Sequence, residues 1–224
     1  MNENNILTYY ILDLDRTTLD TGKSTEVMEG VVALHNSELG VALAQKFAEA
    51  ESLGESFSMR DFIVDSVGEE EMQKIEVKYK EVAAQQDLLI PGAKELFEYI
   101  ESLPDTKFGI LTYGSVLGQK MKLEASGLGN IPALITSETY KGGLIASWRR
   151  DDGLYHLPEE LGGFIAKEII FIDDKPFSFK GLPIDCRGYF VKSVYDAGME
   201  MLPSYVAQPR NLKEVIAAEK QRRA

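Results

Sequence analysis

The feature that most constrains this chain is an apolar run near its start that ends in two closely spaced acids. The run covers residues 9–12 (YYIL), and Asp13 and Asp15 follow it. Such a run is typical of a buried β-strand, and carboxylates at its carboxyl end would emerge where open α/β sheets bind ligands. If the strand continued through both acids, their side chains would point the same way, because side chains alternate along a strand.

Two acids that share one site repel each other. At about 4 Å, two like unit charges repel by about 4 kcal/mol at an effective dielectric constant of about 20. A divalent metal ion or one retained proton is the usual way to relieve such repulsion. Because a solvated turn also carries paired acids, the other strand ends must decide between these interpretations.

The overall charge argues against a nucleic-acid partner. The 224 residues carry a net charge of −12 at pH 7, and the pI is about 4.7. Neutralising phosphates requires clustered lysine and arginine, whereas the basic residues here are scattered. The two exceptions, which we interpret as solvated surface, are Arg149-Arg150 and the tail residues Lys220, Arg222 and Arg223. Cys186 is the single cysteine, which excludes an intrachain disulfide.

The sequence has no segment typical of targeting to a membrane. Its polar start does not resemble a signal peptide, and no apolar run reaches the roughly 20 residues of a membrane span. We therefore expect a cytoplasmic protein without membrane association. The oligomeric state has no readable signal.

Residues 18–90 have the spacing of helices rather than strands. Ser58, with Asp61 three residues later, is typical of a helix start, and we expect Gly22 and Ser24 to form the hinge and N-cap that lead into this region. The expected helices cover 24–39, 41–53, 58–67 and 69–86. Together they predict a helical insert after the first strand.

From Pro91 onward the pattern alternates between helix and strand. Pro91 opens a helix, a second covers Ser115 to Ser126, and Asn211 with Glu214 begins a third. Apolar runs predict strands over 107–112, 133–137, 168–173 and around 188–192. The fold class predicted is α/β, with a Rossmann-like parallel sheet flanked by helices.

Chemically useful side chains follow the later strands as well. Thr112 ends one strand, and Gly114 and Ser115 lead into a helix, so a hydroxyl and free backbone N–H groups there would suit a phosphate. Lys141 lies in an expected loop after the next strand. The adjacent pair Asp173-Asp174 ends the strand after that.

This order of motifs resembles the haloacid-dehalogenase superfamily. DLDRT matches the first motif, ILT the second, Lys141 the third and FIDD the fourth. The resemblance implies an α/β core over 1–17 and 91–224 and a small helical cap domain over 18–90. It covers nearly the whole chain.

The resemblance also implies roles for the matching residues. Asp13 would be the nucleophile that forms an aspartyl-phosphate, and Asp15 the general acid and then base. Mg²⁺ would be held by Asp13, the backbone carbonyl of Asp15, and the Asp173-Asp174 pair. The phosphoryl oxygens would be bound by Thr112, Tyr113, Gly114 and Lys141.

The chain departs from the family pattern at two of its motifs. Arg16 stands where the family commonly has glycine, so it either contacts substrate or shapes the loop. The fourth motif is an adjacent acid pair, of which we favour Asp174 as the direct metal ligand. Two other lysines compete with Lys141 for the phosphate-binding role, namely Lys175 and Lys120.

We therefore interpret the chain as a Mg²⁺-dependent phosphatase that acts on a small phosphorylated metabolite. A phosphomutase, a dehalogenase, or a binding protein with a vestigial site remain alternatives. The segment TGKS at residues 21–24 resembles the end of a nucleotide-binding P-loop, but Thr17 stands where that motif requires glycine. The substrate has no readable code in the sequence.

Overall fold

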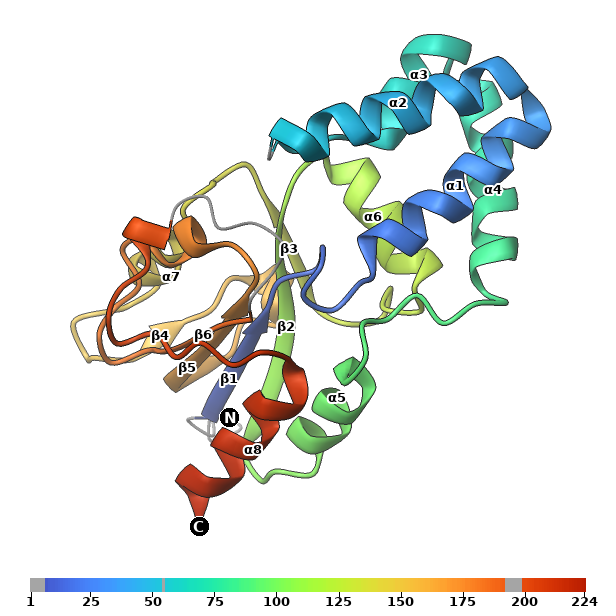
Figure 1. Cartoon of the computed structure of the whole chain (residues 1–224). Coiled ribbons are helices and arrows are strands. Elements are labelled where there is room, and N and C mark those ends of the chain that lie inside the picture. The colour runs from blue at the N-terminus through green and yellow to red at the C-terminus, as the bar shows by residue number, and fades with distance from the viewer. Residues whose placement is uncertain (1–6, 54, 192–198) are drawn as a thin grey trace. The chain divides into compact units, whose positions relative to one another are not determined.

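A computed structural model describes residues 7–53, 55–191 and 199–224, and its chain divides into two units (Figure 1). The first unit consists of Met1–Thr18, Ile90–Tyr113 and Ile131–Ala224. The second consists of Leu19–Leu89 and Gly114–Asn130. Each unit is described separately below.

The first unit is built on a mostly parallel sheet, which confirms the predicted fold class. Its order is β3-β2-β1-β5-β4, and β6 also pairs with β5. The parallel strands are β1 (Leu7–Leu12), β2 (Thr106–Tyr113), β3 (Ala133–Thr136), β5 (Ile165–Asp173) and β6 (Arg187–Phe190). The part of segment 188–192 that lies beyond residue 191 is outside the described residues.

Strand β1 is buried on both faces, as expected of a central strand in a parallel sheet. Tyr9 and Ile11 belong to the apolar core that also includes Ile145 and Trp148. Tyr10 faces the other way, and its hydroxyl donates to Glu219 at 3.0 Å. The alternating side chains of one strand therefore hold packing elements on both sides of the sheet.

Within the described residues of the first unit, three α-helices flank this sheet. Figure 1 shows α5 (Ala93–Glu101) beside α8 (Leu212–Arg223), and the two helices are in contact. Helix α7 (Lys141–Ser147) contributes Ile145 to the apolar core. As predicted, Asn211 caps α8, because its side chain accepts a hydrogen bond from the Glu214 N–H at 3.1 Å.

Two elements of the first unit differ from the sequence-based expectation. Lys141 was expected in a loop, which is wrong, because it is the first residue of α7. The short segment β4 (Tyr155–His156) pairs antiparallel with β5 and was not predicted. Two glycines at the start of α7 and the two-residue length of β4 leave no periodic pattern to detect.

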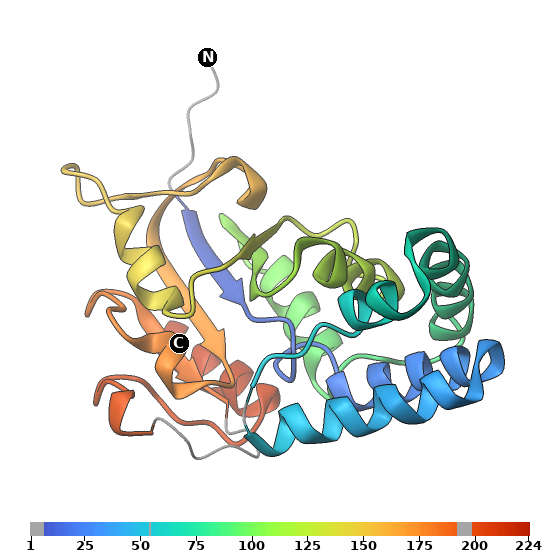
Figure 2. The same cartoon turned by 90° about the horizontal axis from the view of Figure 1, so that it is seen from above.

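The second unit is helical, as predicted for the insert. Helices α1 and α2 lie side by side, and Figure 2 shows the same pair from above. The helices of this unit are α1 (Thr21–His35), α2 (Ser37–Leu53), α3 (Met59–Val67), α4 (Glu69–Ala83) and α6 (Val116–Ala125). None of the helices in the described ranges has the length and apolar character that crossing a membrane requires.

The helix caps and the boundaries of this unit agree only in part with the sequence-based predictions. Ser58 caps α3 as expected, and its hydroxyl accepts from the Asp61 N–H at 3.3 Å. The expected N-cap at Ser24 is wrong, because Asp20 caps α1 by accepting from the Lys23 N–H. Residues 114–130, which the sequence assigned to the core, group here with the insert, and the assignment of a cap domain stays a prediction.

The buried carboxylate of Glu219 joins α8 to the sheet. Besides Tyr10, it accepts hydrogen bonds from the Tyr189 hydroxyl at 2.7 Å and from Arg222 at 2.8 Å. Burial opposes the charged form, but the hydrogen bonds from Arg222 and Tyr189 outweigh it and lower the pKa of Glu219 below its ordinary value of 4.5. The ionised form is therefore favoured by folding.

We expect Glu219→Gln to lower the free energy of unfolding by about 2 kcal/mol at pH 7, because it weakens several charge-assisted hydrogen bonds. The pKa of Glu219 is lower when folded, so this contribution is present above pH 4.5 and is lost as the pH falls through the folded-state pKa. Urea unfolding at several pH values measures both effects.

The exposed Glu98, which lies on α5, provides the matched control. Glu98→Gln should change stability by less than about 0.5 kcal/mol. A stability difference between the wild type and Glu219→Gln that stays constant down to pH 3 would contradict the assignment.

Candidate active site

The register of the sheet brings the acids of two strands to one edge. Leu12 is paired with Ile172 on β5, so the next residues, Asp13 and Asp173, stand at the same level. The Asp13 N–H donates to the Ile172 carbonyl at 2.9 Å, which fixes the position where the chain leaves β1. Asp174 follows directly after β5. All three acids thus lie at the carboxyl ends of parallel strands, where α/β sheets bind ligands.

These three acids form a buried cluster. Carboxylate oxygens of Asp13, Asp173 and Asp174 lie within 4.8 Å of one another, and all three side chains are buried. The separation between residues 13 and 173 in the sequence shows that only the folded sheet assembles this group. Its carboxylate oxygens are of the kind that Mg²⁺ and Ca²⁺ prefer.

Lys141 supplies a buried positive charge to the cluster. Its ammonium group donates to Asp13 Oδ1 and, at 2.7 Å, to Asp173 Oδ2. Burial opposes the charged form, but the charges of Asp13 and Asp173 outweigh it and raise the pKa of Lys141. Lys141 is therefore protonated and bridges two of the three acids.

Two neighbouring groups that the sequence analysis did not assign also orient these acids. The Thr17 hydroxyl donates to Asp13 Oδ2 at 3.2 Å, and the Lys175 N–H donates to Asp173 Oδ1 at 2.8 Å. Thr17 was visible within the first motif, but its direction depends on the turn after β1. The Lys175 ammonium lies 5.7 Å from the centre of the Phe177 ring.

Asp174 is the acid whose buried surroundings disfavour its negative charge. Among the described residues, no group hydrogen-bonds to either of its buried carboxylate oxygens. Burial, and then the charges of Asp13 and Asp173, raise the pKa of Asp174 well above its ordinary value. With all three carboxylates ionised, the cluster and the ammonium of Lys141 would carry an excess of two negative charges. A divalent cation bound to Asp174 would neutralise that excess, so the residues fit a metal site.

The same environment also changes the pKa of Asp13, the candidate nucleophile. Burial raises the pKa of Asp13 to about 6, while the charge of Lys141 opposes this rise and that of Asp173 adds to it. The charge of Asp15 also raises the pKa of Asp13, by less than the charge of Asp173 does. A cation beside these groups would favour ionised Asp13.

The turn after β1 separates Asp15 from the cluster. Strand β1 ends at Leu12, so simple strand alternation does not extend through both acids. Arg16 has a left-handed backbone with φ of 63°, a conformation that favours glycine. Asp15 is half-buried, and its carboxylate is not among the clustered ligand atoms of the described residues.

The residues expected to bind phosphate lie at the end of β2. Thr112 is buried, Tyr113 is about one-third exposed, and Gly114 follows the strand with φ of 145°. Contacts assign Gly114 to the second unit and the other two to the first. The phosphate-binding roles of these residues and of Lys141, and the catalytic roles of Asp13 and Asp15, stay predictions.

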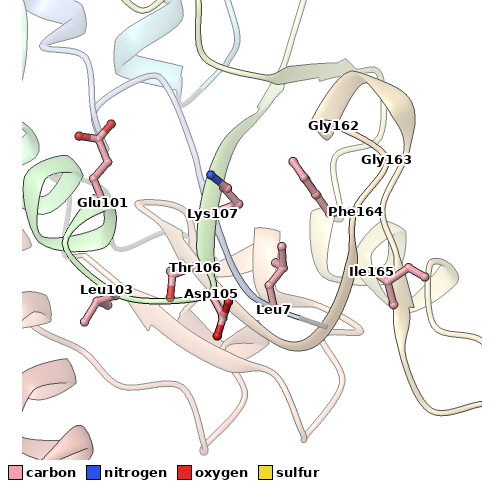
Figure 3. Close-up of a pocket in the computed structure, with 10 residues that line it drawn as sticks. All are labelled: Leu7, Glu101, Leu103, Asp105, Thr106, Lys107, Gly162, Gly163, Phe164 and Ile165. Carbon is pink, nitrogen blue, oxygen red and sulfur yellow. The ribbon is translucent and has the colours of Figure 1, made fainter. Parts of the chain in front are cut away.

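A separate pocket lies at the opposite end of the same sheet. Figure 3 shows that it adjoins Leu7, Thr106 and Ile165, which stand at the amino ends of β1, β2 and β5. Its volume is about 550 Å³, and its lining also includes Glu101, Lys107 and Phe164. The buried acids are at the carboxyl ends of β1 and β5, so this pocket is not part of the candidate active site.

We expect Mg²⁺ to stabilise the wild-type protein by about 2.7 kcal/mol at a free concentration of 100 times the Kd. Asp174→Asn should abolish most of this stabilisation, because it removes a charged ligand. In metal-free buffer the variant should be at least as stable as the wild type, because a neutral group replaces a buried carboxylate that no residue in the described ranges hydrogen-bonds. Thermal unfolding with and without Mg²⁺ measures both effects.

The exposed Asp151 provides a control of the same chemistry, and Asp151→Asn should leave the effect of Mg²⁺ unchanged. Equal Mg²⁺ stabilisation of the wild type and Asp174→Asn would show that the cluster is not the metal site.

Known proteins share the architecture of this chain. No protein-family model matches it, and no curated protein is similar in sequence. A protein described as a haloacid dehalogenase-like hydrolase from Burkholderia xenovorans matches with a TM-score of 0.62 at 12% identity, covering 96% of this chain and 98% of that one.

Two further solved structures match over similar lengths. A haloacid-dehalogenase hydrolase from Bacillus subtilis bound to magnesium has a TM-score of 0.54 at 16% identity, covering 95% of this chain and 98% of that one. L-2-haloacid dehalogenase from Xanthobacter autotrophicus has a TM-score of 0.53 at 13% identity, covering 96% and 98%. Together with the order of the strand-end motifs, these matches show that the chain has the haloacid-dehalogenase fold.

Proposed function

We propose that this protein is a Mg²⁺-dependent phosphatase that hydrolyses a small phosphomonoester. The observation that carries this proposal is the cluster of three buried acids, of which two pair with Lys141 and the third, Asp174, has two oxygens without hydrogen bonds among the described residues. This cluster carries the negative charge that binds a divalent cation, and its member Asp13 is a carboxylate that could attack phosphorus.

The metal would be held by Asp13, Asp174 and the backbone carbonyl of Asp15. When bound, it would neutralise negative charge on the phosphate and on the attacking carboxylate. Asp173 is already hydrogen-bonded to the Lys141 ammonium and the Lys175 N–H, which favours Asp174 as the direct ligand. The similar hydrolase from Bacillus subtilis binds magnesium, which supports the choice of this ion.

Asp13 is the proposed nucleophile. Its carboxylate oxygen would attack phosphorus, the phosphorus–oxygen bond to the leaving alcohol would break, and an aspartyl-phosphate would form. The Thr17 hydroxyl donates to Oδ2 of Asp13, so it restricts the orientation of the attacking group. Lys141 is the buried cation beside Asp13 and would stabilise the phosphoryl oxygens as charge develops.

Asp15 is the proposed general acid and base. It would protonate the leaving alcohol and then accept a proton from the water that hydrolyses the aspartyl-phosphate. The products are the alcohol, inorganic phosphate and regenerated Asp13. Asp15 is half-buried, so it combines access to solvent with an electrostatic influence on Asp13.

The charge of the chain bears on the choice of substrate. A net charge of −12 disfavours polyanionic macromolecules, so a small phosphorylated metabolite is the proposed substrate class. We propose the helical insert as the source of selectivity between such metabolites.

A dehalogenase is the main rival because one of the similar structures has that activity. Dehalogenation by a carboxylate needs no metal ion and no second acid. The buried oxygens of Asp174, which no described residue hydrogen-bonds, and the presence of Asp15 therefore favour the phosphatase.

We expect Mg²⁺-dependent release of inorganic phosphate from at least one ester in a panel of small phosphomonoesters. Asp13→Asn should reduce kcat by about 10⁴-fold or more, because an amide cannot form the covalent intermediate. The control Asp151→Asn should have the activity of the wild type. Phosphate release is measured with and without Mg²⁺ for all three proteins.

The rivals make different predictions in the same series. Halide release from 2-haloacids without added metal would indicate a dehalogenase. Transfer of the phosphoryl group to a second hydroxyl, without net phosphate release, would indicate a mutase. A folded protein that shows none of these activities would contradict the proposal.

A further inference from the structure

Helix α7 begins in unusually close contact with the segment that follows the acid pair. A Cβ atom placed on Gly142 would lie 2.7 Å from the backbone nitrogen of Leu182 and 2.9 Å from the carbonyl oxygens of Phe179 and Lys180. These are backbone atoms, which cannot swing aside as a flexible side chain can. At position 142 only glycine fits this packing.

The contact involves a second glycine on the opposing segment. Gly181 has a left-handed backbone with φ of 79°, and a Cβ atom placed on it would lie 3.2 Å from the Cα of Gly143. Gly143 itself has room, since the nearest atom to a Cβ there is the Lys180 carbonyl oxygen at 3.9 Å. Two backbones therefore meet here, at Gly142 on one side and Gly181 on the other.

The contact joins the two parts of the chain that carry the buried charges. Gly142 directly follows Lys141, whose ammonium lies 2.7 Å from Asp173 Oδ2. The opposing segment continues from Asp173 and Asp174 through the short 3₁₀ helix η2 (Pro176–Phe179). A shift between the two backbones would therefore move the ammonium relative to the carboxylates.

We propose that Gly142 is a positioning residue that holds Lys141 in its ion pairs with Asp13 and Asp173. It acts by permitting the backbone of α7 to approach the 179–182 segment closely. Its catalytic consequence rests on the proposed function, but the position of Lys141 can be tested without any activity.

Gly142→Ala tests this proposal through the chemical accessibility of one amine. The full-length, metal-free protein is labelled with an amine-reactive acetylating reagent, and the modification of each lysine is followed by peptide mass spectrometry. In the wild type, Lys141 is only 3% exposed and ion-paired, so it should react slowly. In Gly142→Ala it should react several-fold faster, because the added methyl separates the two backbones.

Internal and matched controls distinguish a local displacement from general unfolding. Lys122, which is buried in the second unit, should keep its wild-type rate in Gly142→Ala. Gly143→Ala should leave the Lys141 rate unchanged, because its methyl has room. If Gly142→Ala does not fold, Gly181→Ala is measured in the same way. Its methyl group also lies between the two backbones, but the clash is milder, at 3.2 Å from the Cα of Gly143.

An unchanged Lys141 rate in folded Gly142→Ala, or equal acceleration of Lys141 and Lys122, would overturn the proposal. Activity provides a separate result. If the wild type is a phosphatase, Gly142→Ala should lower kcat by about 100-fold, as expected for a 1 Å misplacement, and should have no further effect in a Lys141→Met background. Absence of activity in the wild type would contradict the proposed function and leave the labelling result intact.

Discussion

The buried ion pairs of Lys141 with Asp13 and Asp173 are the interactions on which the candidate site depends. Three acids enclosed at one edge of the sheet would repel strongly without a compensating charge. Lys141 compensates part of this charge, and the fold must bring it from a different element. Asp174 is the acid whose carboxylate oxygens have no hydrogen bond within the described part of the chain, and a bound divalent cation would favour its ionised form.

This arrangement is possible because the sheet around β1 is rigidly packed. Strand β1 lies between β2 and β5, with the apolar core on one face and the hydrogen bonds of Glu219 on the other. These contacts set the level at which Asp13 leaves the sheet, and the pairing of Leu12 with Ile172 sets Asp173 at the same level. Packing far from the acids therefore determines the distances between them.

The chemistry follows from the balance of charges. A carboxylate that attacks a phosphate must approach another anion, so a phosphatase needs cations at the point of attack. Here one cation is built into the protein as Lys141, and the environment of Asp174 suits a second. The fold alone is compatible with several reactions, as its occurrence in a dehalogenase shows. The proposed choice among them rests on the acids of this chain.

Much of the fold could be predicted from the sequence because the patterns that indicate it involve residues close together in the chain. Apolar runs, caps such as Ser58 and Asn211, and strand-end acids depend on neighbouring residues, and they predicted the main strands, the helical insert and the acid positions. The helix that begins at Lys141, the Thr17 hydrogen bond and the backbone contact at Gly142 were not predicted. The sequence by itself determined which charged groups stand at strand ends. Only the tertiary structure decided that Lys141 pairs with Asp13 and Asp173 while the Asp174 oxygens find no hydrogen-bond partner in the described ranges, because these relations depend on register and packing between distant segments.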